Sequence, residues 1–192
     1  MKTQKPSNKM FRFYEKRTAD HIKRVQECIK RILQYFPSDF KNGELLQRAE
    51  YHDKSKYSPK ELVPYVWLTE AYRVGIDKFK YPEGVEQEVR KATKHHITAN
   101  RHHPEYFDSP SEMTDEDIVE MVADWAAMSI ELGTSLTKWV KENINKKWKF
   151  TSDQTKLIWR IVNFMATETR YGKVHLTVSA KNNLFKLRWE NP

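Results

Sequence analysis

The sequence has too little cysteine, too little glycine and too few long apolar runs for several classes of protein. Its single cysteine, Cys28, excludes an internal disulfide framework and favours a reducing compartment, so we expect a cytoplasmic protein. Five glycines and eight prolines are few for the many tight turns of an all-β protein. No apolar run approaches the roughly 20 residues of a membrane span, and no apolar segment follows the charged N-terminus as in a secretory signal. We therefore expect no membrane contact.

Basic residues are scarce in the middle of the chain and gather towards its two ends. The net charge is +8 with histidine neutral, yet residues 36–137 have an acidic balance, and the basic surplus lies in residues 1–35 and 138–192. Basic ends of this kind attract phosphate groups or nucleic acid. A solvated lysine-rich surface has the same composition, so both interpretations stay open.

Apolar residues recur at spacings of three and four along most of the chain, which is the period of an amphipathic helix. Thr114 precedes three acidic residues and is typical of a helix start, and Ser58 with Pro59 predicts another, with the serine as N-cap. The helices that we predict span residues 11–36, 44–52, 59–78, 83–100, 115–132, 135–145 and 153–169. Residues 171–192 have an extended pattern that leaves room for a small β-hairpin. The predicted class is all-α.

Side chains that bind metals lie on the apolar faces of three predicted helices. His21 shares a stripe with apolar residues of the first helix, and His96 and His103 continue the apolar face of the fourth. Asp124 lies between two methionines on a largely apolar side of the fifth. A carboxylate buried alone is costly, so Asp124 needs a cation or hydrogen-bond donors beside it.

His52 and Asp53 lie side by side at the end of the second predicted helix. One inward histidine is usually an ordinary core residue, but several inward imidazoles and carboxylates on separate helices favour a metal site. Without thiolates, this set suits iron, manganese, zinc or magnesium. Because seven residues of helix rise about 10.5 Å, His96 and His103 reach one ion only if the helix ends between them, near Asn100. The alternative is two ions about 3.5–4 Å apart.

The order of these residues resembles the HD superfamily of metal-dependent phosphohydrolases, which reads H … HD … D on an all-α scaffold. His21 corresponds to the first histidine, His52 and Asp53 to the signature pair, and Asp124 to the closing aspartate.

Further motifs carry the resemblance over about residues 10–145. HDKSK at 52–56 is similar to the H-D-x-G-K of the cyclic-dinucleotide-degrading branch, with Ser55 in place of glycine, and RHHPEY at 101–106 is similar to its His-His-Glu element. HITANRHHPE at 96–105 and VADWAAMSIELGT at 122–134 more closely resemble an uncharacterised HD-like family of bacteria and tailed phages.

The resemblance implies an HD-like helical bundle that holds one or two divalent ions and hydrolyses a nucleotide or another small phosphate ester with a metal-activated water. The implied metal ligands are His21, His52, Asp53, His96, His102, His103 and Asp124. Asp53 would bridge two ions. Lys56 and Arg101 would bind the substrate phosphate, with Lys56 also catalytic. Glu105 would orient a histidine or act as a general base, although a surface lysine and an ordinary salt bridge stay open for Lys56 and Glu105.

Three domain segments follow: a disordered terminus at 1–9, the metal-binding helical domain at 10–145, and a basic, tryptophan-rich extension at 146–192 packed on it. The extension interleaves tryptophan with lysine or arginine in KKWKF, LIWR and KLRW. Such residues stack on bases and neutralise phosphates, but tryptophan at this spacing is also typical of a core, of a cover over the site or of a homodimer contact. A mixed-valence di-iron oxygenase on the same scaffold and a nucleic-acid-binding module stay open as alternative functions.

Overall fold

The computed structural model describes the backbone of residues 4–171, 175–177 and 186–188, and the side chains of residues 4–166. Within this part the chain is an all-α bundle, as predicted. Its α-helices are α1 (Asn8–Tyr35), α2 (Asn42–Tyr51), α3 (Leu62–Val74), α4 (Val85–Ala99), α5 (Asp115–Leu132), α6 (Leu136–Asn143) and α7 (Ser152–Tyr171). Short 3-10 helices lie between them at η1 (Lys54–Tyr57), η2 (Pro104–Tyr106) and η3 (Pro110–Glu112). The strands β1 (His175–Thr177) and β2 (Lys186–Arg188) pair antiparallel, as the predicted hairpin requires.

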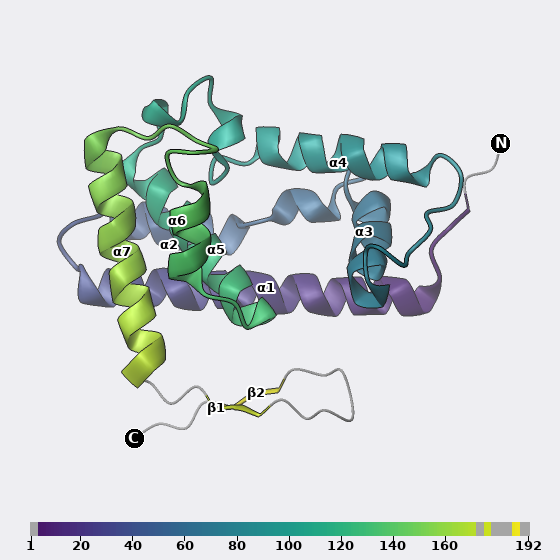
Figure 1. Ribbon diagram of the computed structural model, residues 1–192, viewed down its shortest axis with the longest axis horizontal. Helices are drawn as coiled ribbons and strands as arrows, with labels where there is room; N and C mark the ends of the chain where they lie inside the picture. Colours follow the sequence, from purple (N-terminus) through teal and green to yellow (C-terminus); the bar gives the residue numbers. More distant parts are fainter. Residues whose placement is uncertain (1–3, 172–174, 178–185, 189–192) are drawn as a thin grey trace.

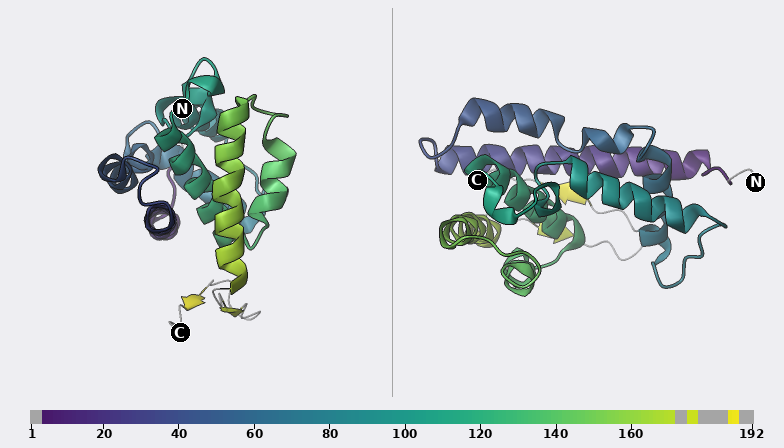
Figure 2. Two further views of the ribbon diagram at one scale, coloured as in Figure 1. Left: turned by 90° about the vertical axis from the view of Figure 1, so that its left-hand side faces the viewer. Right: turned by 90° about the horizontal axis from the view of Figure 1, so that it is seen from above.

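Helix α1 lies along the long axis of the molecule and contacts four other helices, α2, α3, α5 and α7 (Figure 1). Figure 2 shows α7 and α6 next to each other on one side of the bundle, away from α2. Helix α3 packs on α4 near the N-terminal end of α1. The helices therefore form two unequal groups along α1, a larger one around α5 and a smaller one made by α3 and α4.

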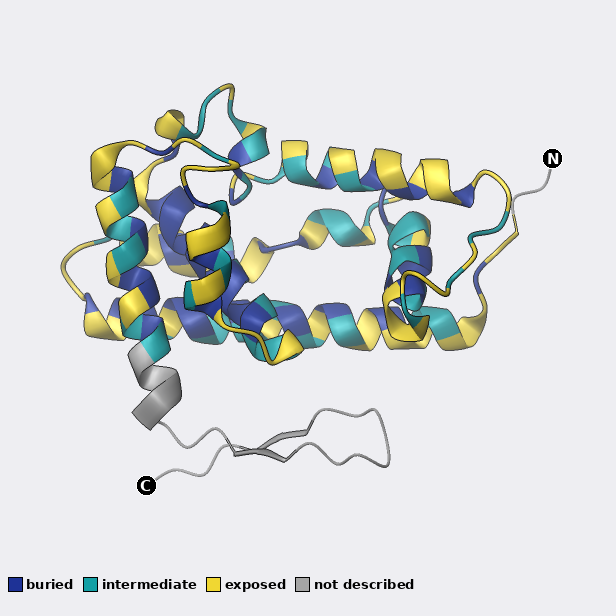
Figure 3. Ribbon diagram, in the orientation of Figure 1, coloured by how far each residue is buried: buried dark blue, intermediate teal, exposed yellow. Residues whose placement is uncertain are grey.

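The larger group shares one continuous core. Figure 3 shows α5 buried along most of its length, whereas α4 exposes its outer side. Ile158 and Val162 of α7 belong to the same cluster of buried residues as Ile29 of α1 and Val122 of α5. The core therefore includes side chains from both sides of residue 145, the boundary that we predicted between the helical domain and the extension, and α7 contributes to it directly.

Three tryptophans, one each from α5, α6 and the predicted extension, pack together. The ring of Trp125 is stacked on that of Trp148 at 5.8 Å between centroids, and it lies 4.7 Å from that of Trp139. The core interpretation of tryptophan therefore holds for Trp148, which is half-buried. The side chains of the sequence after residue 166 lie outside the described residues.

The starts of α1 and α3 differ most from the sequence prediction. Helix α1 begins at Asn8 because the Ser7 hydroxyl accepts a hydrogen bond from the backbone N–H of Met10 at 3.3 Å. The predicted disordered terminus at 1–9 therefore overlaps a helix at its last two residues.

Helix α3 begins at Leu62, not at Pro59, so the prediction for residues 59–78 was wrong at both ends. Residues 58–61 form a turn in which the backbone N–H groups of Glu61 and Leu62 donate to the carbonyl of Ser58. Gly75 ends the helix with a φ of 104°, a conformation that glycine adopts readily. None of the described helices is long and apolar enough to cross a membrane.

Asp117 ties the start of α5 to two other segments. Its carboxylate accepts hydrogen bonds from Thr114 in a capping box, and it pairs with Arg48 of α2 at 2.6 Å and with Arg101 at 2.9 Å. Burial alone would raise the pKa of this fully buried carboxyl, but the hydrogen bonds from Arg101, Thr114 and Arg48 outweigh burial and lower it. A single buried charge therefore holds together the N-terminus of α5, α2 and the loop after α4.

We expect Asp117→Asn to lower the free energy of unfolding by about 3 kcal/mol, because it removes the buried anion that Arg48 and Arg101 share. Denaturant unfolding followed by circular dichroism measures this change. Asp115→Asn is the matched control, since Asp115 is an exposed acid in the same helical turn. Equal stability of the two variants would contradict the prediction.

Candidate metal centre

The turn after α2 allows two neighbouring side chains to face inward. His52 is extended, with φ −50° and ψ 132°, and Asp53 is left-handed, with φ 57°. Aspartate is among the few residues other than glycine that adopt this conformation without large strain. The chain then continues into η1. As a result His52 and Asp53 are both buried, with 2% and 1% of their surfaces exposed.

One group of donor atoms surrounds a single oxygen of Asp53. Nε2 of His21 lies 3.5 Å and Nε2 of His52 lies 3.7 Å from Oδ2 of Asp53. Oδ1 of Asp124 lies 3.0 Å and 3.7 Å from the same two nitrogens. Residues of α1, the α2–η1 turn and α5 thus meet at one point, as the predicted convergence of these four side chains requires.

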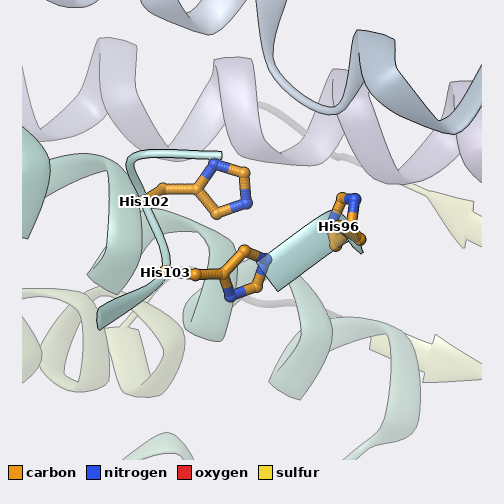
Figure 4. Close-up of side chains that lie close together, drawn as sticks. All are labelled: His96, His102 and His103. Carbon is orange, nitrogen blue, oxygen red and sulfur yellow. The ribbon is translucent and has the colours of Figure 1, made fainter. Parts of the chain in front are cut away.

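A second group faces the other oxygen of Asp53. Nε2 of His96 lies 3.2 Å and Nε2 of His102 lies 3.5 Å from Oδ1 of Asp53. Helix α4 ends just before Asn100, which is extended, so the chain turns back and brings His103 within 5.0 Å of His96 between ring centroids. Figure 4 shows His96 on α4 and the other two histidines on the loop that follows it. Because α4 ends before Asn100, His96 and His103 are not separated by the rise of about 10.5 Å that seven helical residues would impose.

Glu120 of α5 contacts the outer nitrogens of two of these histidines. Its Oε1 lies 2.9 Å from Nδ1 of His52 and 3.4 Å from Nδ1 of His102. Its other oxygen accepts a hydrogen bond from Arg48 at 2.8 Å, and Arg48 also binds Asp117. Glu120 therefore orients one histidine from each group, so that Nε2 of both points towards Asp53.

Glu61 plays the same part for the second group. Its Oε2 lies 2.9 Å from Nδ1 of His96, its Oε1 lies 2.7 Å from Nδ1 of His95, and it accepts a hydrogen bond from Ser55 at 3.0 Å. Its exposed fraction is 0%. A carboxylate so placed fixes which nitrogen of each histidine is free to bind another group.

The charges of the site are strongly coupled. Burial disfavours the charged forms of Asp53 and Asp124. Lys56 and the nearby histidines nevertheless hold the pKa of Asp53 well below its usual range, and His21 and His52 do the same for the pKa of Asp124. Burial likewise opposes the charged form of His52, but Asp53 and the nearby carboxylates outweigh it and raise its pKa to about 10. Burial lowers the pKa of His102, and that of His103 to about 3, which favours the neutral form that binds metals.

The donor atoms of the two groups fit divalent metal ions. Four buried atoms of the two groups have no hydrogen-bond partner among the described residues: Nε2 of His52, Oδ1 of Asp53, Nε2 of His102 and Nε2 of His103. Buried polar atoms are normally satisfied. The ligand atoms of His21, His52 and Asp53 lie within 4.8 Å of one another, and so do those of His96, His102 and His103. Imidazole nitrogens and carboxylate oxygens at this spacing could hold a metal ion in each group.

Lys56, which we predicted to bind the substrate phosphate, lies beside Asp53. Its Nζ lies 2.5 Å from Oδ2 of Asp53, and its side chain is 19% exposed. The backbone carbonyl of Lys56 accepts a hydrogen bond from the hydroxyl of Tyr14 at 2.7 Å, which anchors η1 to α1. Lys56 therefore connects the buried aspartate with the surface.

Arg101 and Glu105 have other partners. The guanidinium of Arg101 binds Asp117 and lies over the rings of Tyr106 and Phe107. Glu105 accepts a hydrogen bond from the indole of Trp148 at 3.1 Å. Within the described part of the chain, no hydrogen bond or ion pair joins either residue to the histidines. Their predicted roles in substrate binding and proton transfer stay predictions without a contact to support them.

Sequence reasoning overlooked both orienting glutamates. Glu120 precedes Asp124 by four residues, so the helical period alone places the two carboxylates on one face of α5. That signal was available. Glu61 has no such signal, because it lies in the turn before α3 and its partner His96 lies on α4, 35 positions later.

Comparison with protein families yields a match. The sequence model of a family described as "Family of unknown function (DUF5662)" matches residues 10–169, which spans α1 to almost the end of α7. No curated protein and no solved structure matches the chain.

Proposed function

Because the chain belongs to this family of unknown function, DUF5662, its own residues are what indicates its chemistry, and from them we propose that it is a metal-dependent hydrolase. The centre would hold two divalent ions, and the substrate would be a phosphate ester of a small molecule, with nucleotides as the first class to test. The resemblance to the HD superfamily seen in the sequence supports the same reaction.

The observation that carries the proposal is the position of Asp53 between the two groups. One of its oxygens faces His21 and His52, and the other faces His96 and His102. A buried carboxylate with nitrogen donors at both oxygens is suited to bridge two cations. His21, His52 and Asp124 would hold the first ion. His96, His102 and His103 would hold the second.

Bound divalent ions supply two things that phosphate-ester hydrolysis needs, a water of lowered pKa and a positive charge on the phosphoryl oxygens. The chain supplies position. Glu120 and Glu61 keep the imidazoles of both groups aimed at Asp53, and burial of the carboxylates excludes bulk water, which strengthens each electrostatic contact. Lys56 reaches from Asp53 to the surface, where its ammonium would contact a phosphate arriving from solvent.

The proposal is tested with protein purified without added metal. Elemental analysis gives the identity and number of bound ions, and release of inorganic phosphate from p-nitrophenyl phosphate and from a set of nucleotides gives activity after reconstitution with Mn²⁺, Fe²⁺, Zn²⁺ or Mg²⁺. We expect metal-dependent phosphate release. Metal-loaded protein that releases phosphate from none of these compounds would overturn the hydrolase.

We expect Lys56→Ala to keep its metal content and to lower kcat/KM by about a hundredfold, because one preorganised charged donor to a transition state contributes about that much. Metal analysis and steady-state kinetics on the same preparation separate the two effects. Lys54→Ala is the matched control, since Lys54 is exposed and lies over the ring of Tyr51. Unchanged kcat/KM in Lys56→Ala would remove this residue from the mechanism.

A second candidate is a mixed-valence di-iron oxygenase, and one observation favours it. The group made by His96, His102 and His103 has three imidazoles, and Asp53 is the carboxylate nearest to it. Histidine-rich donor sets suit iron as well as zinc. Two tightly bound irons with a mixed-valence EPR signal would favour the oxygenase, whereas exchangeable manganese with phosphatase activity would favour the hydrolase.

A further inference from the structure

A pocket separate from the metal centre opens between α3, α4 and the segment before α1. Its volume is about 490 Å³, within the range of small-molecule sites. Val63, Trp67 and Ala92 give it apolar walls, and Trp67 is 7% exposed. Among the described residues that line it, none is a proposed metal ligand.

The pocket has a small surplus of positive charge. Lys60, Lys91 and Glu88 line it together with His95. Lys91 forms an ion pair with Glu88 at 2.9 Å, whereas Lys60 has no ion pair within the described part of the chain. One cation is thus left for a ligand. A flat apolar body with a single anionic group matches both the walls and the charge.

The pocket is connected to the metal centre by three consecutive contacts. His95 lines the pocket, and its Nδ1 lies 2.7 Å from Oε1 of Glu61. The other oxygen of Glu61 lies 2.9 Å from Nδ1 of His96, whose Nε2 lies 3.2 Å from Asp53. The side chain of His95 is 34% exposed, whereas those of Glu61 and His96 are buried. The partly exposed end of this chain of contacts therefore lies at the pocket.

We propose that this pocket binds a small aromatic molecule with one anionic group, and that its occupant strengthens metal binding at His96. A ligand packed against His95 restricts that ring and, through Glu61, restricts His96 in the orientation that faces Asp53. Preorganised ligands bind metal more tightly because less freedom is lost on binding. Linkage requires the reverse as well: metal must strengthen binding in the pocket by the same factor.

The first experiment measures binding of 8-anilinonaphthalene-1-sulfonate, an aromatic sulfonate, to metal-free protein by fluorescence. We expect Lys60→Glu to weaken binding about tenfold, because it replaces an attraction by a repulsion. Lys94→Glu is the matched control, since Lys94 is exposed on α4 and does not line the pocket. Equal affinities of the two variants would overturn the site.

The second experiment measures the affinity for Zn²⁺ with and without a saturating concentration of the same sulfonate. We expect binding about fivefold tighter in its presence, and no difference in His95→Ala, where the connection is broken. An unchanged Zn²⁺ affinity in the wild-type protein would overturn the coupling. The coupling rests on the metal centre proposed above, but both measurements concern binding, so they stay informative if the protein proves not to hydrolyse phosphate esters.

Discussion

Replacing Asp53 with alanine is expected to abolish metal binding in both histidine groups and, with it, hydrolysis. The bridging carboxylate supplies negative charge to both ions, so its loss affects the two groups together, whereas loss of one histidine affects mainly its own group. Metal ions contribute several kcal/mol to such reactions, and 1.36 kcal/mol is a factor of ten, so the rate should fall by about a thousandfold or more. Elemental analysis and phosphate release measure both effects.

The backbone at Asp53 calls for a second variant. Its φ of 57° is strained for alanine, so the alanine variant could lose metal through a change of the turn. Asp53→Asn keeps the shape, and asparagine tolerates this conformation, so it removes the charge alone. Asp20→Asn, on the outer side of α1, is the control for a lost aspartate. If both Asp53 variants retained full metal content, Asp53 would not be a ligand.

The second large effect is expected at Glu120. Glu120→Gln should weaken metal binding by about 10- to 100-fold, the usual cost of losing a carboxylate that orients ligating histidines. The reason is that Glu120 contacts Nδ1 of both His52 and His102, one from each group. A competition titration with a chelator of known affinity measures the change.

Glu116→Gln is the matched control for Glu120→Gln. Glu116 is also buried on α5, one turn earlier, but its oxygen faces the backbone N–H of Lys41 at 3.4 Å. Circular dichroism shows whether both variants fold. Nuclear magnetic resonance of the imidazole nitrogens tests the orienting role directly, since the tautomers of His52 and His102 should become mixed in the glutamine variant. Wild-type affinity and fixed tautomers in Glu120→Gln would contradict this role.

The sequence predicted best where a local signal has one physical reading. Helix α5 begins and ends where predicted, because Thr114 and Asp117 form a capping box and Gly133 adopts a φ of 63° at the other end. Ser58 and Pro59 are a local signal with two readings, helix start or turn. The structure has the turn, and α3 begins three residues later than predicted.

The residues of the candidate site also differ in how well the sequence predicted them. His21, His96, His103 and Asp124 were found because their helical phase continues the apolar faces of the predicted helices. His52 and Asp53 were found as an adjacent pair at a helix end, and His102 was assigned from the family resemblance. Glu61 was missed because its contacts with His95 and His96 depend on how α3 and α4 pack, which no local pattern encodes. Arg101 and Glu105 were assigned from the resemblance carried by RHHPEY at residues 101–106, yet the turn after α4 directs them to Asp117 and Trp148.

The sequence distance between the proposed ligands has a consequence for stability. The first group joins His21 on α1 to Asp124 on α5. The second group joins His96 on α4 to Asp53 in the α2–η1 turn. Ions held there would act as cross-links that close long loops of the chain, and closing a long loop removes much conformational entropy from the unfolded state. Metal binding would then count as folding free energy. Treatment with a chelator should therefore lower the melting temperature and make the chain more sensitive to proteases, by an amount that grows with metal affinity.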